Sequence, residues 1–269
     1  MSSADQSWPV AKVLGILNVT PDSFSDGGRF LNLDVALAHA EAMLAEGADI
    51  IDVGGESTRP GADPVDPIEE IDRVVPVIEK LASRSRISID TRNETVARAA
   101  VAAGATIIND VSASLWPVAA ELGVGWVGMH MQGDPGTMQR APNYVDVVAQ
   151  VLDFLVERAE AAAAAGVGEL WIDPGFGFGK TLDHNLKLLA NIDRLVATGW
   201  PVAVGTSRKG MLGHLIARSD GADQQTPLDD RLVGSVTTAA YAMLQGVAMV
   251  RVHDVKAAKQ AATVVAGER

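Results

Sequence analysis

Residues 86–130 read RISIDTRNETVARAAVAAGATIINDVSASLWPVAAELGVGWVGMH, and this stretch decides the fold class. It holds three short apolar runs, Arg86–Thr91, Thr106–Val111 and Gly125–His130, which are separated by amphipathic stretches. The runs are continuously hydrophobic instead of alternating, as is typical of parallel strands that are buried on both faces. A strand followed by a helix and then by another strand predicts an α/β fold with a parallel sheet.

The same alternation continues in both directions along the 269-residue chain. The predicted strands are Val13–Val19, Asp49–Gly55, Arg86–Thr91, Thr106–Val111, Gly125–His130, Leu170–Pro174, Pro201–Ser207 and Met249–Asp254. The predicted helices are Asp34–Glu46, Ile68–Ser83, Glu94–Ala103, Pro117–Leu122, Val145–Ala165, Asn185–Thr198, one within Leu228–Leu244, and Val255–Val265. Eight such units favour a (β/α)₈ TIM barrel over a doubly wound sheet, and such barrels need about 250 residues. We predict a single barrel domain over residues 13–269, after a short N-terminal extension over residues 1–12.

Composition excludes several classes of function. The chain has 22 Lys and Arg against 34 Asp and Glu, a net charge of −12, so we expect neither nucleic acid nor an anionic membrane as a partner. The absence of cysteine excludes disulfides, Cys-ligated zinc and Cys nucleophiles. No secretory signal pattern and no apolar run of about 18 residues is present, so we expect a cytoplasmic protein.

Polar residues collect where the predicted strands end. The residues at these ends are Asn18, Gly54–Gly61, Asp90, Asn109–Asp110, Met129–His130, Asp173–Lys180, Thr206–Lys209 and Arg251–Asp254. A single Asp or Asn at such a position is often only a turn cap. In a barrel, however, these ends meet at the face that carries the active site, so their convergence predicts a ligand site.

The candidate residues differ in charge around the barrel. Lys209, Arg251 and His253 follow the last two strands, where barrels often bind phosphate. A short helix predicted at about 210–217 could hold an anion near Ser207 through its N-terminal N–H groups, although the basic residues there could also be a solvated surface pair. Acidic and amide groups that suit a flat heterocycle follow the third, fourth and sixth strands: Asp90, Asn109 and Asp173.

Two loops and several absent motifs complete the pattern. The glycine-rich segments Thr20–Phe30 and Gly54–Pro67 are expected to be mobile lids, with ordinary surface loops as the alternative. Gly175–Gly179 lacks the order of a dinucleotide fingerprint. The chain also lacks a nucleophile elbow and the paired histidines of zinc hydrolases.

Seven segments, in order, resemble the signatures of dihydropteroate synthases. They are residues 17–28 (LNVTPDSFSDGG), 52–61 (DVGGESTRPG), 88–91 (SIDT), 109–112 (NDVS), 173–178 (DPGFGF), 205–209 (GTSRK) and 251–254 (RVHD). The resemblance extends from about Val13 to Val265. It implies a pterin-binding barrel that joins 6-hydroxymethyl-7,8-dihydropterin diphosphate to 4-aminobenzoate in folate biosynthesis. It further implies Mg²⁺ as cofactor, a homodimer, and sensitivity to sulfonamides.

The resemblance also assigns roles to residues. Asn18 resembles the family's Mg²⁺ ligand, and the diphosphate is expected at Asn18, Arg251 and His253, with Thr58 nearby. The pterin pocket is expected to contain Asp90, Asn109, Asp173 and Lys209. The aminobenzoate site is expected to contain Thr58, Arg59, Pro60, Phe178 and Ser207. Phe24 and Arg59 belong to the two mobile loops.

The expected reaction is a dissociative displacement of diphosphate from the pterin methylene group by an aryl amine. Arg251 and His253, together with Mg²⁺, are expected to neutralise charge on the leaving group, and Lys209 to face the pterin carbonyl. Asp90 and Asp173 are expected to stabilise a cation-like pterin. One alternative is a barrel of the methyltetrahydrofolate–corrinoid methyltransferase type. A second alternative is a non-catalytic pterin-binding relative. A third is a phosphate-handling barrel isomerase or aldolase, but such enzymes usually have a Schiff-base Lys or a Glu base inside a strand, whereas Lys209 follows its strand and is next to Arg208.

Overall fold

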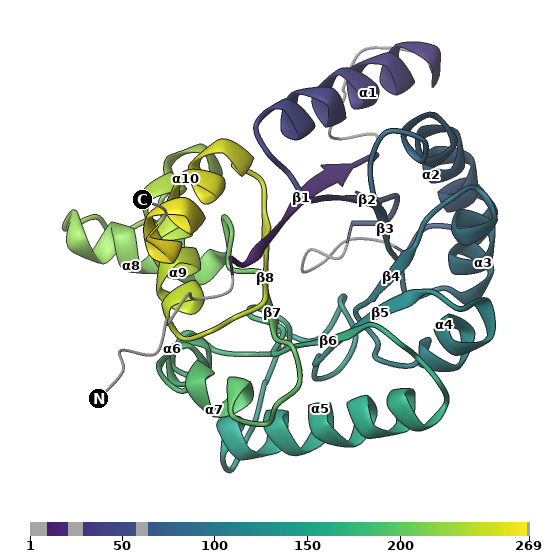
Figure 1. The fold of residues 1–269 in the computed structure, drawn as a ribbon. Coiled ribbons are helices and arrows are strands. Elements are labelled where there is room, and N and C mark those ends of the chain that lie inside the picture. Colours follow the sequence, from purple (N-terminus) through teal and green to yellow (C-terminus); the bar gives the residue numbers. More distant parts are fainter. Residues whose placement is uncertain (1–9, 21–28, 58–63, 268–269) are drawn as a thin grey trace, which may run out of the picture.

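The computed structural model describes residues 10–20, 29–57 and 64–267, and these form a barrel of parallel strands surrounded by helices (Figure 1). The strands are β1 (Lys12–Asn18), β2 (Ile50–Gly54), β3 (Ile87–Asp90), β4 (Ile107–Asp110), β5 (Gly125–Met129), β6 (Leu170–Asp173), β7 (Ala203–Val204) and β8 (Met249–Val252). Their order is β6-β5-β4-β3-β2-β1-β8-β7, and a parallel bridge between Ile172 and Val202 joins the two ends. The predicted (β/α)₈ barrel is therefore confirmed.

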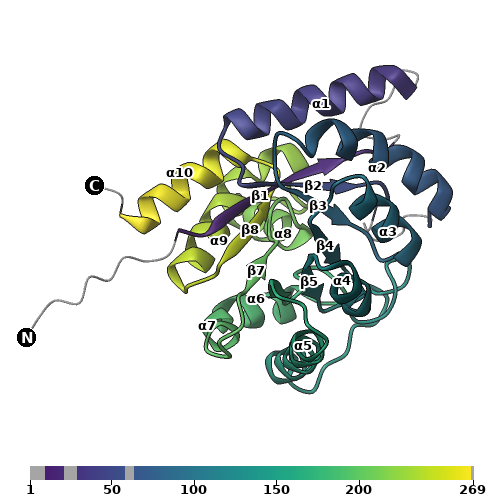
Figure 2. The ribbon, with the colours of Figure 1, turned by 45° about the vertical axis from the view of Figure 1, so that its right-hand side comes forward.

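The helices cover the outside of the barrel (Figures 1 and 2). They are α1 (Arg29–Ala45), α2 (Pro67–Leu81), α3 (Glu94–Ala102), α4 (Trp116–Leu122), α5 (Val147–Ala164), α6 (Leu182–Ala190), α7 (Ile192–Val196), α8 (Gly210–Ser219), α9 (Leu232–Leu244) and α10 (Val255–Ala266). In the described part of the chain, no helix combines the length and the apolarity needed to cross a membrane.

Local backbone chemistry sets the helix boundaries. Side chains of Asp66, Asn93 and Asp146 accept hydrogen bonds from N–H groups in the first turn of α2, α3 and α5, which fixes where these helices begin. The prediction of a single helix over Asn185–Thr198 is wrong. Asn191 has non-helical dihedral angles (φ −120°, ψ 25°) and separates α6 from α7. The first helix also begins at Arg29, before its predicted start at Asp34.

The barrel interior consists of layers of side chains. An apolar layer receives one side chain from each of seven strands: Leu14, Ile50, Ile107, Val127, Trp171, Ala203 and Met249. Side chains on a strand alternate between its two faces, so the residue two positions further along points into the same interior. Those residues are Ile16, Asp52, Asn109, Met129, Asp173, Gly205 and Arg251. Four of these seven are polar or charged (Asp52, Asn109, Asp173 and Arg251), and we call this second level the polar layer because it lies directly above an apolar floor.

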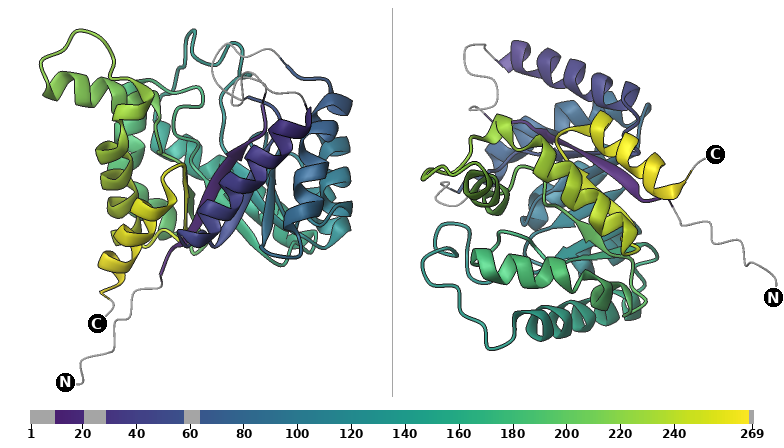
Figure 3. Two further views of the ribbon diagram at one scale, coloured as in Figure 1. Left: turned by 90° about the horizontal axis from the view of Figure 1, so that it is seen from above. Right: turned by 90° about the vertical axis from the view of Figure 1, so that its left-hand side faces the viewer.

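The polar layer faces the end of the barrel where the strands finish. Figure 3 shows α8 and the connection from β5 to α5 at this end, while β1 begins at the opposite end. Because all strands are parallel, this end collects the residues that follow each strand.

Candidate active site

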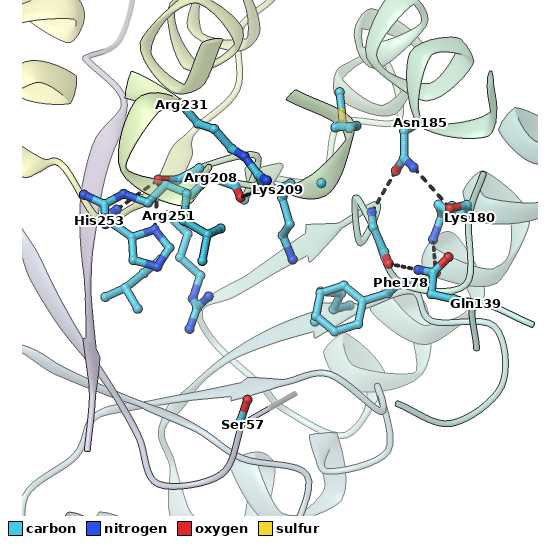
Figure 4. A pocket seen from close by; sticks show the side chains of 18 of the residues that line it. Ser57, Gln139, Phe178, Lys180, Asn185, Arg208, Lys209, Arg231, Arg251 and His253 are labelled. Atoms are coloured by element: carbon cyan, nitrogen blue, oxygen red, sulfur yellow. Dashed lines mark hydrogen bonds between the residues drawn. The ribbon is translucent and has the colours of Figure 1, made fainter. Parts of the chain in front are cut away.

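A cavity of about 830 Å³ lies at the carboxyl ends of the strands (Figure 4). Every predicted site residue that the structure describes lines it: Asn18, Asp90, Asn109, Asp173, Phe178, Ser207, Lys209, Arg251 and His253. The predictions for Phe24, Thr58, Arg59 and Pro60 concern positions outside the described residues. Sequence segments that are far apart therefore meet around one cavity.

An arginine between two carboxylates occupies the base of this cavity. Arg251 on β8 donates from Nε to Asp52 Oδ2 (2.6 Å) and from Nη2 to Asp90 Oδ2 (2.5 Å). Asp52 Oδ2 also accepts a hydrogen bond from Asn109 Nδ2 at 3.1 Å. From the sequence we expected basic residues after the last two strands and acidic residues after other strands. In the structure these two sets are not separate, since Arg251 is paired with carboxylates on both sides.

Burial changes the acid–base properties of these groups. It raises the pKa of Asp90 to about 6 even though Arg251 opposes the shift, because a carboxylate removed from water loses its hydration. Burial, assisted by Arg251, lowers the pKa of Lys209 to about 8. Burial also raises the pKa of Asp173. Buried groups whose pKa values are shifted in this way, two carboxyl groups upward and a lysine downward, are typical of an active site when they share one cavity.

Phe178 and Lys209 approach one another from two different loops. Lys209 Nζ lies 4.1 Å from the centroid of the Phe178 ring, and the two side chains extend towards each other in Figure 4. Asp173 anchors the loop that carries Phe178, because its Oδ1 accepts a hydrogen bond from the Gly175 N–H at 2.7 Å. The ring and the ammonium group together form an apolar and cationic wall.

Ser207 and His253 are joined by two hydrogen bonds. The Ser207 Oγ accepts from the His253 backbone N–H (3.1 Å) and lies 3.0 Å from Nδ1 of the same residue. Burial, with Arg251 and Arg208 nearby, lowers the pKa of His253 to about 3. A lowered pKa favours the neutral imidazole, so His253 offers a hydrogen bond to a ligand while the fixed positive charge beside it is that of Arg251.

Comparison with known proteins gives the family. The model of the family described as "Pterin binding enzyme" matches residues 14–253. The dihydropteroate synthase of Mycobacterium leprae is 50% identical over 94% of this chain and 92% of its own length. The chain belongs to the dihydropteroate synthase family.

Solved structures of the same family superimpose closely. A Yersinia pestis dihydropteroate synthase in complex with a sulfonamide drug has a TM-score of 0.86 and 46% identity, covering 96% of this chain and 94% of that one. A Xanthomonas albilineans dihydropteroate synthase with 4-aminobenzoic acid has a TM-score of 0.85 and 47% identity, covering 94% of this chain and 91% of that one. The predicted family and fold are confirmed.

Sequence reasoning gave no role to Asp52, which the structure places at the centre of the site. It is fully buried, and it holds both Arg251 and Asn109. Asp52 lies inside the apolar run Asp49–Gly55, not at its end, so a search of strand ends overlooks it. The alternation of side chains along a strand could have indicated its role. This alternation directs Asp52, two residues before the end of the strand at Gly54, into the barrel interior, where a carboxylate requires a partner.

A buried lysine that was also given no role supports the neighbouring loops. Lys180 Nζ lies 3.0 Å from His130 Nδ1, and it donates to the carbonyl oxygens of His130 (3.2 Å), Gly175 (3.0 Å) and Phe178 (3.0 Å). Its pKa is lowered to about 7 by burial. This lysine ties the end of β5 to the loop that carries Phe178.

The residues at Asn18 are compatible with one type of metal site. The Asn18 Oδ1 and Asp90 Oδ2 atoms each lie 3.7 Å from the position that a Cβ on Gly54 would take, so the missing side chain of Gly54 leaves space beside them. Within the described ranges, no group of three or more His, Asp or Glu side chains is arranged to hold a metal. Mg²⁺ typically uses few protein ligands and completes its shell with water and substrate phosphate oxygens, so one amide oxygen in an open cavity fits that ion.

Proposed function

We propose that this chain joins 6-hydroxymethyl-7,8-dihydropterin diphosphate to 4-aminobenzoate and releases diphosphate and 7,8-dihydropteroate. The observation that supports this most strongly is a single cavity that combines Asp90, Asn109 and Asp173 with Lys209 and Arg251 in a barrel of this family. The acidic and amide groups suit a flat heterocycle rich in N–H donors. Lys209 suits the carbonyl of that heterocycle, and Arg251 suits an anionic leaving group.

The pterin is proposed to bind against Asp173, Asn109 and Lys209. Asp173 would accept from the 2-amino and N3 edge of the ring, and Lys209 would donate to the carbonyl side. Because the Asn109 Nδ2 donates to Asp52, its Oδ1 remains available as an acceptor for a ring N–H. The apolar floor below this layer would pack against the lower edge of the bicycle.

The diphosphate is proposed to bind at Asn18, Arg251 and His253, with Asn18 as the protein ligand of Mg²⁺. When bound, Mg²⁺ would supply positive charge that stabilises diphosphate as it leaves. Arg251 would add a second fixed charge, and neutral His253 would donate a hydrogen bond. Asp90 and Asp173 would stabilise the positive charge that the pterin methylene group develops during a dissociative reaction.

The aminobenzoate site is proposed to combine Phe178 and Ser207 with Thr58, Arg59 and Pro60, and Phe24 to act from the first loop. Closure of both loops over bound pterin diphosphate would complete this site, which gives an ordered reaction with the pterin substrate first. A random-order kinetic pattern would contradict this order.

Sulfonamides are proposed to inhibit the chain. Positions 24, 58 and 60 hold Phe, Thr and Pro, as in a sulfonamide-sensitive enzyme, and a relative is described with such a drug bound. The expected result is competition between sulfamethoxazole and 4-aminobenzoate in initial-rate assays. Insensitivity at drug concentrations far above that of 4-aminobenzoate would contradict this prediction.

A homodimer is also proposed, and helix α9 supports it. Three apolar side chains of this helix, Val233, Tyr241 and Leu244, are 78%, 38% and 53% exposed. Their spacing of eight and then three residues places them on one side of the helix. Such an apolar stripe is typical of a helix that packs against another surface. A cytoplasmic location and the absence of nucleic-acid or membrane partners stay predictions.

The decisive experiment is a product assay. The protein is incubated with the pterin diphosphate, 4-aminobenzoate and MgCl₂, and 7,8-dihydropteroate is measured by chromatography and mass spectrometry. We expect product with Mg²⁺ and its loss when EDTA is added. Binding of the pterin without any dihydropteroate would favour a non-catalytic relative. Turnover that requires a corrinoid would favour a methyltransferase.

A further inference from the structure

We propose that Arg231, Ser235 and Asp254 are positioning residues that hold the backbone of Arg208 in a left-handed conformation, and that this conformation directs Ser207 and Lys209 into the substrate cavity. This inference rests on the proposed function. It concerns a residue that lies between two of the proposed ligand contacts.

The backbone of Arg208 is unusual for its residue type. Its φ angle is +57°, and among the described residues other than glycine only Ala113 also has a positive φ. In this conformation the Cβ atom crowds the following carbonyl oxygen, so a side chain other than glycine adopts it at a cost. Such residues persist where several surrounding contacts fix them, and they are concentrated at functional sites.

Three contacts fix Arg208 from three directions. Its N–H donates to Ser235 Oγ (3.0 Å), and its carbonyl oxygen accepts from Arg231 Nη1 (3.0 Å). Its guanidinium group binds both carboxylate oxygens of Asp254, from Nη2 at 2.6 Å and from Nε at 3.1 Å. The backbone N–H, the carbonyl oxygen and the guanidinium group of Arg208 thus all have hydrogen-bond partners. We refer to Arg231, Ser235 and Asp254 as the Arg208 clamp.

The clamp itself is rigidly held. Ser235 is buried, and its hydroxyl donates to the Arg231 carbonyl oxygen at 2.7 Å while it accepts from Arg208. Arg231 is 5% exposed, and its Nε and Nη2 both donate to the carbonyl oxygen of Thr226. Within the described residues, the hydrogen bonds of this buried guanidinium all go to backbone carbonyl oxygens. Arg231 therefore fixes the position of backbone groups and does not pair with a carboxylate.

The residues on either side of Arg208 show what the clamp achieves. Ser207 is bound to His253, and Lys209 extends over the ring of Phe178 (Figure 4). A hydrogen bond from the Lys209 N–H to the Thr206 carbonyl oxygen (3.1 Å) closes the turn. The left-handed residue reverses the chain, so that Ser207 and Lys209 both line the cavity. If the backbone of Arg208 relaxed, both side chains would shift.

Two variants at position 208 separate conformation from charge. Arg208→Ala and Arg208→Gly both remove the ion pair with Asp254, but only glycine adopts a left-handed conformation without cost. We expect Arg208→Gly to have a KM for 4-aminobenzoate about fivefold lower than that of Arg208→Ala, which corresponds to the lower limit of the left-handed penalty. Equal KM values in the two variants would overturn the proposal.

Ser235→Ala provides the second test, through a double-mutant cycle. In the Arg208→Ala background, loss of the Ser235 hydroxyl should raise the KM about fivefold, since the N–H of a strained residue loses its acceptor. In the Arg208→Gly background, the same substitution should change the KM less than about twofold. Equal effects in both backgrounds would show that Ser235 contributes only to folding, and would overturn the proposal.

A matched control identifies purely structural effects. The Thr198 hydroxyl also binds backbone groups, in the connection from α7 to β7: it donates to the Leu195 carbonyl oxygen (2.6 Å) and accepts from the Trp200 N–H (3.3 Å). Thr198→Ala should lower the unfolding midpoint without changing the KM for either substrate, whereas Ser235→Ala should change the KM. If Ser235→Ala behaves as Thr198→Ala does, the clamp has no positioning role. A wild-type chain that forms no dihydropteroate would instead contradict the proposed function, and so the two failures are distinguishable.

Discussion

The two ends of the barrel carry similar arginine–carboxylate clusters in different surroundings. At the end where the strands begin, Arg86 precedes β3 and pairs with Glu169, which precedes β6 and also binds Lys12 at 3.3 Å. At the other end, Arg251 pairs with Asp90, the last residue of β3, and with Asp52. The same strand therefore has an ion pair near each of its ends.

The acidic groups in the two clusters respond in opposite ways. Hydrogen bonds from Arg86 lower the pKa of Glu169, whose side chain is 38% exposed. Burial raises the pKa of Asp90, whose side chain is 13% exposed, although it also pairs with an arginine. The comparison shows that solvent access decides the direction of the pKa shift of a carboxyl group that is paired with an arginine. In the partly exposed pair the pKa is lowered, and in the buried pair it is raised towards neutral pH. Chemistry is therefore expected only at the buried cluster.

The largest expected effect is at the buried ion pair. Asp90→Ala and Arg251→Ala should each lower turnover by about a hundredfold or more, because loss of one fixed group that stabilises developing charge costs roughly 2.7–4 kcal/mol. Steady-state kinetics measure this, and circular dichroism checks that the barrel persists. Near-normal turnover in either variant would remove that residue from the catalytic group.

Asp52→Asn tests whether Asp52 orients its partners. The amide keeps the shape of the carboxylate, but it lacks the negative charge with which Asp52 accepts hydrogen bonds from Arg251 and Asn109. We therefore expect the Kd of the pterin substrate to rise about tenfold, as for a lost charge-assisted hydrogen bond. Calorimetric titration measures this Kd. Glu169→Gln is the matched control at the opposite end and should leave the Kd unchanged. An unchanged Kd in Asp52→Asn would contradict the role that we give to Asp52.

The pH dependence of kcat/KM should report the buried groups. With Asp90 at a pKa of about 6 and Lys209 at about 8, the required forms are the ionised carboxylate and the protonated ammonium. The value of kcat/KM should therefore fall as the pH drops below about 6 and again as it rises above about 8. Asp90→Asn should abolish the acidic limb. Persistence of that limb in Asp90→Asn would assign it to another group.

The smallest effect is expected at the exposed cluster. Glu169→Gln should lower the free energy of unfolding by at most about 1 kcal/mol, because partly exposed ion pairs contribute little. Since the pKa of Glu169 is lowered in the folded state, this contribution is present above its unfolded pKa of 4.5 and is lost as the pH falls through the folded value. Urea unfolding at pH 7 and at pH 3 measures the difference. A large loss at pH 7 would contradict the comparison.

Much of the fold followed from local sequence patterns. All eight predicted strands are present, because a buried parallel strand needs an apolar run wherever it lies in the barrel. The helix predicted over Asn185–Thr198 is interrupted because the backbone of Asn191 leaves helical geometry, and the helical periodicity on both sides of it conceals this break. Helix boundaries depend on capping contacts, which hydrophobic periodicity does not record.

The candidate site was predictable to the extent that it lies at strand ends. Lys209 and Asp173 were found in this way because parallel strands must finish at one face. Asp52 was not, since it lies within a strand and acts through Arg251 and Asn109. Arg208 gave no signal of its left-handed backbone either, because glycine usually marks such positions and arginine does not.

The sequence alone determined the order of strands and helices and the placing of polar residues at one end of each strand, because both depend on neighbouring residues in the chain. Only the tertiary structure decided which of these residues meet. Arg251 lies 199 residues from Asp52 and 161 from Asp90 along the chain, and closure of the barrel brings all three into hydrogen-bonding distance. Removal of the cluster from water then sets its pKa values, and burial of this kind is a property of the packed barrel and not of any segment within it.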